Sequence, residues 1–184
     1  MIGIDEVGRG CWAGPLVVVA AKLNTKISGL KDSKDLSRSK REQLFEIIEK
    51  EAEIGIAIIE PSVLDTIGLG PALYQAFAEA INTIKTKDIS EIIVDGNVNY
   101  LKGIYDKSQC VIKADSLYPS VSAASIYAKV TRDRIMYQLS KKYPEFGFEK
   151  HVGYGTKLHL EALKKYGPIK GVHRFSYKPI RSLC

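Results

Sequence analysis

Five short runs of apolar, mostly β-branched residues constrain the fold of this chain more than any other feature. Each run has the length and composition of a β-strand and is bounded by polar or glycine-containing segments. The predicted strands span residues 1–7, 15–23, 53–59, 89–94 and 109–113. The first two are predicted to form a hairpin, because Gly8-Arg9-Gly10 between them has the composition of a turn.

Segments typical of helices lie between and after the later strands. They cover about 40–52, a short stretch from Ser62, a stretch from Pro71 to about Ile84, about 121–141, and 156–166. In the first, capped by Ser37 or Ser39, we expect Leu44, Ile47 and Ile48 to share one face. Three strands in meander order, followed by strands that alternate with helices, predict an α/β fold with a mixed sheet covered by helices. A length of 184 residues suits a single domain.

The charge of the chain is unevenly distributed. The net charge is +6, but residues 1–112 sum to −3 and residues 113–184 to +9. Such a distribution predicts a positive face, which is typical of proteins that bind polyanions. A solvated, lysine-rich surface explains the charge alone equally well.

The cysteine pattern and the hydropathy of the sequence indicate the cellular compartment in which the protein is expected. Cys11, Cys110 and Cys184 are an odd number without metal-binding spacing, so neither a disulfide framework nor a structural zinc site is expected. No apolar run is long enough for a membrane helix, and Asp5 and Glu6 interrupt any signal-peptide core. We therefore expect a cytoplasmic protein.

Carboxylates recur at the ends of the predicted strands. Asp5 and Glu6 lie in the first, Asp95 ends the fourth and Asp115 nearly ends the fifth. Strand ends in an α/β sheet converge on one crevice, so these carboxylates would repel one another unless a cation or a proton neutralised them. Oxygen-only ligands suit Mg²⁺ or Mn²⁺, and two such ions can promote phosphodiester hydrolysis. For any single Asp, capping of a turn is a simpler explanation.

The ordered motifs of the chain resemble the ribonuclease HII family. They are DEVGRGCWAGP (5–15), KDSKDLS (31–37), IIVDGN (92–97), KAD (113–115), SAASIYAKVTRDR (122–134), YPEFGFEKHVGYGT (143–156) and HRFSY (173–177). The resemblance implies a ribonuclease H-like fold, with a five-stranded mixed sheet flanked by helices. It also implies a small helical C-terminal part, from about residue 143, within one catalytic domain over residues 1–184.

The resemblance further implies a metal-dependent endoribonuclease. Such an enzyme cleaves the RNA strand of RNA/DNA hybrids and single ribonucleotides embedded in duplex DNA, using Mg²⁺ or Mn²⁺ and leaving 3′-hydroxyl and 5′-phosphate ends. Nucleic acid is then its partner, with no membrane association, and we expect a monomer.

Site residues carry over from the family's motifs one by one. The four metal-binding carboxylates fall on Asp5, Glu6, Asp95 and Asp115, which are also the strand-end acids. The backbone that senses the ribose 2′-hydroxyl falls on Gly8, Arg9 and Gly10, and the Tyr that stacks on the sugar at the RNA–DNA junction falls on Tyr154. Lys34 and Lys129 are candidate phosphate contacts. We expect structural hydrogen bonding from His151 and His173.

The chain departs from the family pattern at two places. Val152 stands where a basic residue usually precedes the GYGT stretch, which removes a possible phosphate contact. Gly68-Leu69-Gly70-Pro71 replaces an Asn-containing helix start, so a polar group facing the substrate is expected to be missing.

Two other functions are compatible with part of this pattern. Another ribonuclease H-like nuclease, such as a junction resolvase, shares the clustered carboxylates but needs no 2′-hydroxyl sensor like Gly8-Arg9-Gly10 with Tyr154. A nucleic-acid-binding module without catalysis would lack at least one of the four carboxylates, and all four are present.

Overall fold

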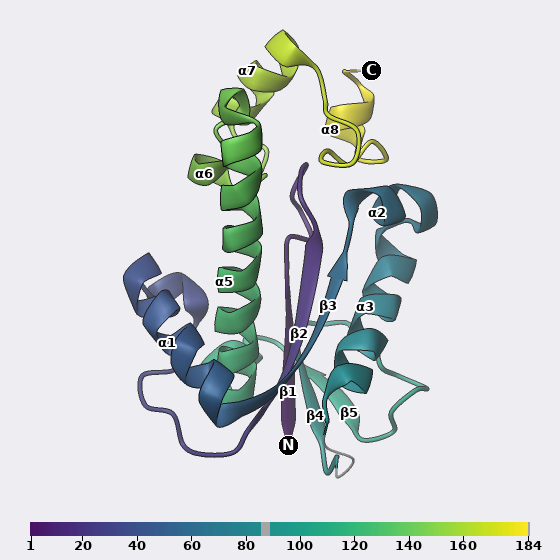
Figure 1. The fold of residues 1–184 in the computed structure, drawn as a ribbon. Helices are drawn as coiled ribbons and strands as arrows, with labels where there is room; N and C mark the ends of the chain where they lie inside the picture. The colour runs from purple at the N-terminus through teal and green to yellow at the C-terminus, as the bar shows by residue number, and fades with distance from the viewer. Residues whose placement is uncertain (86–88, 184) are drawn as a thin grey trace. The chain divides into compact units, whose positions relative to one another are not determined.

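The predicted mixed sheet is present. The computed structural model describes residues 1–85 and 89–183, with a five-stranded sheet in the order β3-β2-β1-β4-β5 (Figure 1). The strands are β1 (Ile2–Val7), β2 (Leu16–Leu23), β3 (Ala52–Ile59), β4 (Ile92–Asp95) and β5 (Ser108–Val111). β1 pairs antiparallel with β2 and parallel with β4, which pairs parallel with β5. The antiparallel β1–β2 pair confirms the predicted hairpin.

The helices include all those expected and several short ones. The α-helices are α1 (Arg38–Glu51), α2 (Pro61–Ile67), α3 (Leu69–Thr83), α4 (Ala114–Leu117), α5 (Pro119–Lys142), α6 (Phe148–His151), α7 (Lys157–Tyr166) and α8 (Lys178–Arg181), with 3₁₀ turns η1 (Ser33–Asp35) and η2 (Pro144–Phe146). Ser37 caps α1 by accepting from the Lys40 N–H, and Thr156 caps α7 by accepting from the His159 N–H. One-turn helices such as α4, α6 and α8 are too short to produce a periodic pattern, so the sequence did not predict them.

Three expectations about local structure were wrong. The fourth strand begins at Ile92 rather than at residue 89. The fifth ends at Val111, so Asp115 lies in helix α4 and not at a strand end. In α1 the buried residues are Leu44, Phe45 and Ile48, while Ile47 is 43% exposed, because the apolar face of the helix is rotated away from it.

The described residues pack as two compact units. The first contains Met1–Val7, Val17–Ala57 and Leu73–Val130, and the second contains Gly8–Leu16, Ile58–Ala72 and Thr131–Cys184. Helix α5 contributes to both. The expectation of one domain over residues 1–184, with a helical part from about residue 143, stays a prediction.

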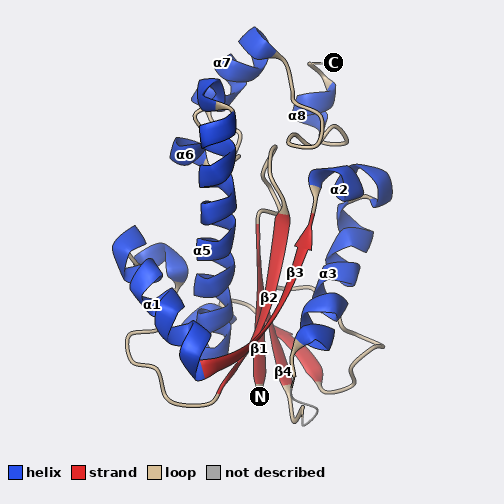
Figure 2. Ribbon diagram, in the orientation of Figure 1, coloured by secondary structure: helices blue, strands red, loops and turns tan. Residues whose placement is uncertain are grey.

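In the first unit, helices cover both faces of the sheet (Figure 2). The core on one face joins β2 residues such as Val19 to α1 residues such as Leu44 and to the alanine-rich start of α5. On the other face, α3 approaches β3 closely, since a Cβ on Gly55 would overlap the Ala80 carbonyl. Gly3 of β1 has the same role toward α5, because a Cβ there would overlap the backbone at Ser120 and Val121. Gly3 therefore brings the start of α5 against the central strand β1, and Gly55 brings α3 against β3.

The second unit has its own core. Its buried members are Ala13, Met136, Phe146, Phe148, Ala162, Leu163, Val172 and Ile180. Two fully buried arginines, Arg132 and Arg174, also lie in this unit and donate to backbone carbonyls. Among the residues described, no helix is long and apolar enough to span a membrane. Cys11 and Cys110 are not joined in a disulfide, and Cys184 lies outside the described residues.

Candidate active site

The sheet brings Asp5 and Asp95 to neighbouring positions. In the parallel β1–β4 pair, Ile4 is opposite Val94, and each Asp follows directly in its strand. Both strands are buried up to this point, so their carboxylates are the first polar groups after two apolar strands. Asp5 and Asp95 are therefore side by side in the sheet, although Asp5 lies inside β1 and not at its end.

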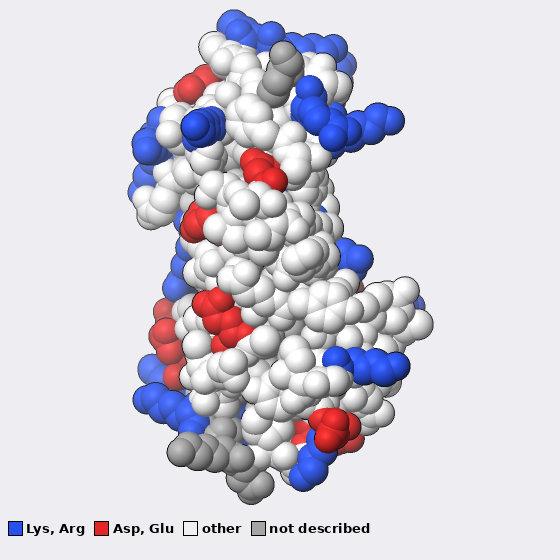
Figure 3. Space-filling view, turned by 90° about the vertical axis from the view of Figure 1, so that its right-hand side faces the viewer, with Lys and Arg blue, Asp and Glu red and all other residues white. Residues whose placement is uncertain are grey.

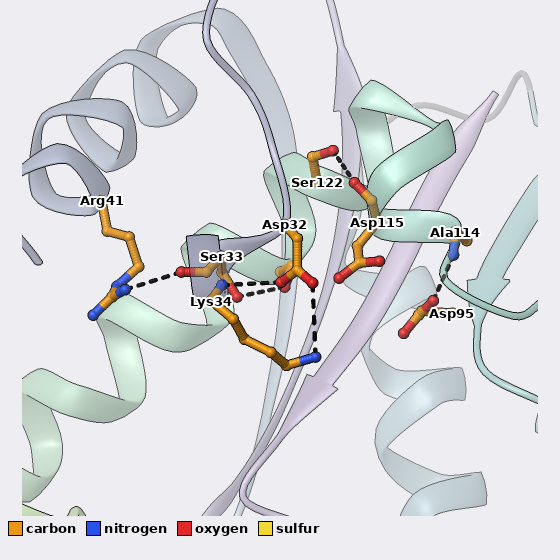
Figure 4. A network of polar contacts seen from close by, with 9 residues as sticks. Asp32, Ser33, Lys34, Arg41, Asp95, Ala114, Asp115 and Ser122 are labelled. Atoms are coloured by element: carbon orange, nitrogen blue, oxygen red, sulfur yellow. Dashed lines mark hydrogen bonds and ion pairs between the residues drawn. The ribbon is translucent and has the colours of Figure 1, made fainter. Parts of the chain in front are cut away.

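Asp115 reaches the same region from helix α4. The chain leaves β5, turns through Lys113 in the left-handed conformation (φ 59°), and enters the helix. The Ala114 N–H at the start of that helix donates to Asp95 Oδ1 at 2.7 Å, which ties Asp95 to the segment carrying Asp115 (Figure 4). Ser122 of α5 donates to the Asp115 carbonyl. A backbone reversal with tertiary hydrogen bonds thus positions Asp115.

The electrostatics show that these acids act on one another. Burial raises the pKa of Asp5 to about 8, with further increases from Glu6 and Asp95, and a hydrogen bond with Ser125 opposes the shift. Burial also raises the pKa of Asp115, again with a contribution from Asp95. A divalent cation would remove this mutual repulsion.

Asp32 is a further acid at this site that the sequence analysis missed. Its charge contributes to the raised pKa of Asp115, and the charge of Lys34 opposes that effect. Asp32 Oδ1 accepts from the Lys34 N–H at 2.9 Å, and Asp32 Oδ2 lies 3.9 Å from Lys34 Nζ (Figure 4). Asp32 belongs to the KDSKDLS motif, so the signal was present, but no strand end marked it as part of the site.

The loop carrying Asp32 and Lys34 is anchored on both sides. The Ser33 and Ser125 hydroxyls are 3.0 Å apart, and Arg41 Nη1 donates to the Ser33 and Leu36 carbonyls. Lys34 is therefore held beside the carboxylates, with its side chain 84% exposed. Lys129 lies one turn of α5 after Ser125 and is half-buried.

The acids form a set of oxygen donors suited to a hard cation. Asp5, Glu6, Asp95 and Asp115 carry no sulfur or imidazole among them, which matches Mg²⁺ or Mn²⁺ and not zinc. In the part of the chain that the structure describes, no three His, Cys, Asp or Glu side chains already form a cation-binding group. The all-oxygen donor set, with Asp5 and Asp95 adjacent on paired strands and Asp115 in the segment bonded to Asp95, fits a cation.

The second unit contains the Gly8-Arg9-Gly10 segment. Gly8 has a φ of +95°, and a Cβ there would overlap Arg132 Nε, so both the backbone and the packing require glycine. A Cβ on Gly10 would meet nothing within 4 Å. The surface at Gly10 is therefore open to a ligand, and the fold itself does not demand glycine there.

Two buried arginines shape the chain after that segment. Arg132 donates to the Ala13 and Pro15 carbonyls at 2.9 Å and to the Val152 carbonyl at 2.7 Å. Arg174 donates to the Gly14 carbonyl and, at 3.2 Å, to the Arg9 carbonyl. The Tyr177 hydroxyl also donates to the Arg9 carbonyl at 2.7 Å. The sequence analysis missed these roles, because a side chain that donates to backbone carbonyls far away in the sequence has no local signature.

Tyr154 lies next to the same segment. The Trp12 N–H donates to the Gly153 carbonyl at 2.8 Å, which joins the two stretches of chain. The Tyr154 side chain is 43% exposed, enough for a ring face to contact a ligand. Burial of its inner part, followed by the nearby Cys11, raises the pKa of its hydroxyl. The second unit thus brings Tyr154 and the Gly8-Arg9-Gly10 segment together, and the first unit brings the carboxylates together.

The two departures from the family pattern have structural roles. Val152 ends α6 with a φ of 43°, an unusual conformation for a β-branched residue, and its side chain packs against the core of the second unit. Gly68 ends α2 with a φ of 80°, and α3 begins at the next residue. Neither position carries a polar side chain.

Comparisons with known proteins agree with the motifs. The model of the family described as Ribonuclease HII matches residues 2–180. Ribonuclease HII of Clostridioides difficile (strain 630) is 48% identical over 178 residues, which cover 95% of this chain and 68% of that protein. Ribonuclease HII of Aliarcobacter butzleri (strain RM4018) is 44% identical, with 97% and 90% covered.

The fold has solved counterparts. The crystal structure of the ribonuclease H2 from Pyrococcus horikoshii OT3 has a TM-score of 0.84 and 32% identity, and it covers 99% of this chain and 95% of that one. The α/β fold expected from the resemblance, a five-stranded mixed sheet flanked by helices, is confirmed.

Proposed function

We propose, since this chain belongs to the ribonuclease HII family, that it hydrolyses nucleic acid in a metal-dependent reaction. Its substrates would be RNA/DNA hybrids and single ribonucleotides embedded in duplex DNA. Members of this family are endonucleases that hydrolyse the RNA strand of RNA/DNA hybrids, so the chain is a hydrolase of that class. The finer substrate range and the metal requirement are our proposal.

Asp5, Glu6, Asp95 and Asp115 would hold two Mg²⁺ or Mn²⁺ ions. When bound, such ions activate water and stabilise the leaving oxygen of a phosphodiester, which here would give 3′-hydroxyl and 5′-phosphate ends. The protein's own contribution to the reaction would be to orient the carboxylates. The Ala114 N–H holds one oxygen of Asp95, and the raised pKa of Asp5 reflects how strongly this carboxylate disfavours its charge without a cation.

Lys34 and the second unit would supply substrate binding. The exposed ammonium of Lys34 lies beside the acids, where it can pair with a phosphate. At Gly10 the backbone is open to close approach, so Gly8, Arg9 and Gly10 can read a 2′-hydroxyl with peptide groups. The half-exposed ring of Tyr154 would pack on the deoxyribose beyond the ribonucleotide. Lys129 is a second candidate for a phosphate contact.

One observation carries this proposal: Asp5 and Asp95 occupy adjacent positions on paired strands, and a hydrogen bond from the Ala114 N–H to Asp95 joins them to the segment that carries Asp115. The test is a labelled DNA duplex with one ribonucleotide, incubated with Mg²⁺, with Mn²⁺ and with EDTA, beside an all-DNA duplex. We expect a single cut at the ribonucleotide with either metal and none with EDTA or without the ribonucleotide. Cleavage in EDTA would contradict the metal site, and cleavage of the all-DNA duplex would contradict 2′-hydroxyl sensing.

The monomeric state and the cytoplasmic location expected from the sequence belong to the same proposal. Size-exclusion chromatography with light scattering would check the first, and cell fractionation the second.

A further inference from the structure

The three histidines of the chain form a buried cluster in the second unit. His159 and His173 are fully buried, and His151 is nearly so. The rings of His151 and His159 stack with centroids 4.4 Å apart, and those of His159 and His173 are 5.3 Å apart. The proposed hydrolysis uses none of them.

The hydrogen bonds of the cluster determine where each proton lies. The Ile169 N–H donates to His173 Nδ1 at 2.8 Å, so the proton of a neutral His173 is on Nε2. That nitrogen lies 3.1 Å from His159 Nε2, which must then accept. The proton of His159 is consequently on Nδ1, which donates to the Tyr154 carbonyl at 2.9 Å. One directed chain runs from the Ile169 amide to the backbone of Tyr154.

This chain of hydrogen bonds requires the imidazole rings of both His159 and His173 to be neutral. A proton added to His173 Nδ1 would face the Ile169 N–H, and a proton added to His159 Nε2 would face the N–H of His173. Burial, followed for His173 by the charge of His159, lowers the pKa of both histidines to about 4, which agrees with the geometry. Buried hydrogen-bond chains of this kind hold their end groups firmly.

His151 holds the other side of Tyr154. Its Nδ1 accepts from the Gly153 N–H at 3.2 Å, and its carbonyl accepts from the Tyr154 N–H at 2.9 Å. The backbone before Tyr154 is thus bound to one histidine, and the backbone after it to another. The ring of Tyr154, by contrast, is half-exposed, so its direction depends on this backbone.

We propose that His159 and His173 form a neutral imidazole relay that positions Tyr154, and that this relay sets the activity of the enzyme at RNA–DNA junctions. The proposal rests on the proposed function, since it assigns a purpose to the orientation of Tyr154. His159 and His173 are positioning residues: they act on the substrate only through Tyr154.

Nitrogen NMR of the wild-type protein tests the relay without any substrate. At pH 7 we expect His159 to carry its proton on Nδ1 and His173 to carry its proton on Nε2, each as a single tautomer. A His159 protonated on Nε2, or a rapid mixture of tautomers, would overturn the relay.

Single-turnover cleavage kinetics test whether the relay sets the activity at RNA–DNA junctions. His159→Phe keeps an aromatic ring but removes the donor, and we expect about a tenfold loss on the single-ribonucleotide duplex but less than about a threefold loss on a long hybrid. His159→Asn offers an amide donor near the position of Nδ1 and should restore most of the loss. The control Phe148→Leu disturbs the ring packed edge-on against His159, at 5.6 Å, without removing a hydrogen bond, and should affect both substrates equally.

A double-mutant cycle separates positioning from general stability. In a Tyr154→Ala background, His159→Phe should cause no further loss at the junction, since its effect passes through the missing ring. Additive losses, or equal behaviour of His159→Phe and Phe148→Leu, would overturn the relay alone. A wild-type protein that leaves the single ribonucleotide uncut would overturn the proposed function together with the junction role, while the tautomer measurement would still judge the relay.

Discussion

Burial makes the ionised form of Asp5 unfavourable in the folded protein. Its folded-state pKa of about 8 exceeds the ordinary value of 3.8, so the folded protein binds more protons between these values than the unfolded chain does. The stabilisation associated with the neutral carboxyl is present below the unfolded pKa and is lost as the pH rises through this window.

Asp5→Asn should therefore separate stability from catalysis. Without metal at pH 8, we expect the free energy of unfolding to rise by at least about 1 kcal/mol, because the amide stays neutral. Cleavage should become undetectable while hybrid binding in EDTA is largely kept, and Asp95→Asn should also lose cleavage. Urea denaturation and single-turnover assays measure these effects, with the exposed Asp106→Asn as control. Full activity in Asp5→Asn would contradict its role as a ligand.

Tyr154 offers a second prediction at the residue scale. Tyr154→Ala removes a ring that is 43% exposed, so we expect little change in stability and about a tenfold loss of cleavage at a single embedded ribonucleotide. Cleavage of a long hybrid, which offers RNA on both sides of the cut, should decrease less. Tyr154→Phe keeps the ring face and should behave like the wild type on both substrates. Equal losses for Tyr154→Ala on both would argue against a junction role.

Among the structural elements, the segments joined by the histidine cluster should respond to acid. The pKa of His159 and His173 is about 4 in the folded protein, below the ordinary 6.5, so between these values the unfolded chain binds more protons. Stability should therefore fall as the pH drops from 6.5 toward 4, by up to roughly 2.7 kcal/mol per pH unit for the two groups. His151, stacked on His159 and facing Glu149, adds to this effect, since burial lowers its pKa as well.

Urea denaturation at pH 7, 6 and 5 measures this dependence. Comparison of the wild type with a His159→Phe, His173→Phe variant isolates the histidines, because the carboxylates are common to both proteins. The difference in the free energy of unfolding between the wild type and this double variant should shrink as the pH falls. A difference independent of pH would mean that the buried histidines do not titrate in this window.

The elements differ in how far the sequence predicts them. β1, β2 and β3 follow from runs of apolar residues, and their observed limits lie within a residue of those expected. Helix α4 does not, because it depends on the left-handed Lys113 and on the bond from the Ala114 amide to Asp95, neither of which has a local signature. The residue identity of Asp115 was therefore predictable, whereas its position in a helix was not. Asp32 was missed for a similar reason: it joins the site through a loop anchored by Ser33 on Ser125.

On the scale of the whole molecule, the structure changes how the charge is divided. The second unit contains 13 Lys and Arg against 6 Asp and Glu, whereas the first contains 14 against 15. The division of charge expected from the sequence, between residues 1–112 and residues 113–184, is thus only approximate. Gly8–Leu16 and Ile58–Ala72 precede residue 113 but belong to the basic second unit. Figure 3 shows, on one face, lysine and arginine side chains gathered over the C-terminal helices. The first unit, with a net charge of −1, carries Asp5, Glu6, Asp95 and Asp115, whereas the second unit, with a net charge of +7, carries none of these four acids.

This division predicts which lysines hold the nucleic acid. In EDTA, Lys164→Glu with Lys165→Glu on α7 should weaken hybrid binding by about tenfold and make its salt dependence shallower by about one to two units, since each lost phosphate contact releases one counterion fewer. The control, Lys102→Glu with Lys107→Glu in the first unit, makes the same change in net charge at exposed positions. Because long-range attraction depends on net charge and contacts depend on position, only the α7 pair should alter the salt slope. Binding titrations between about 50 and 200 mM salt would show this, and equal slopes for the two pairs would place the phosphate contacts outside α7.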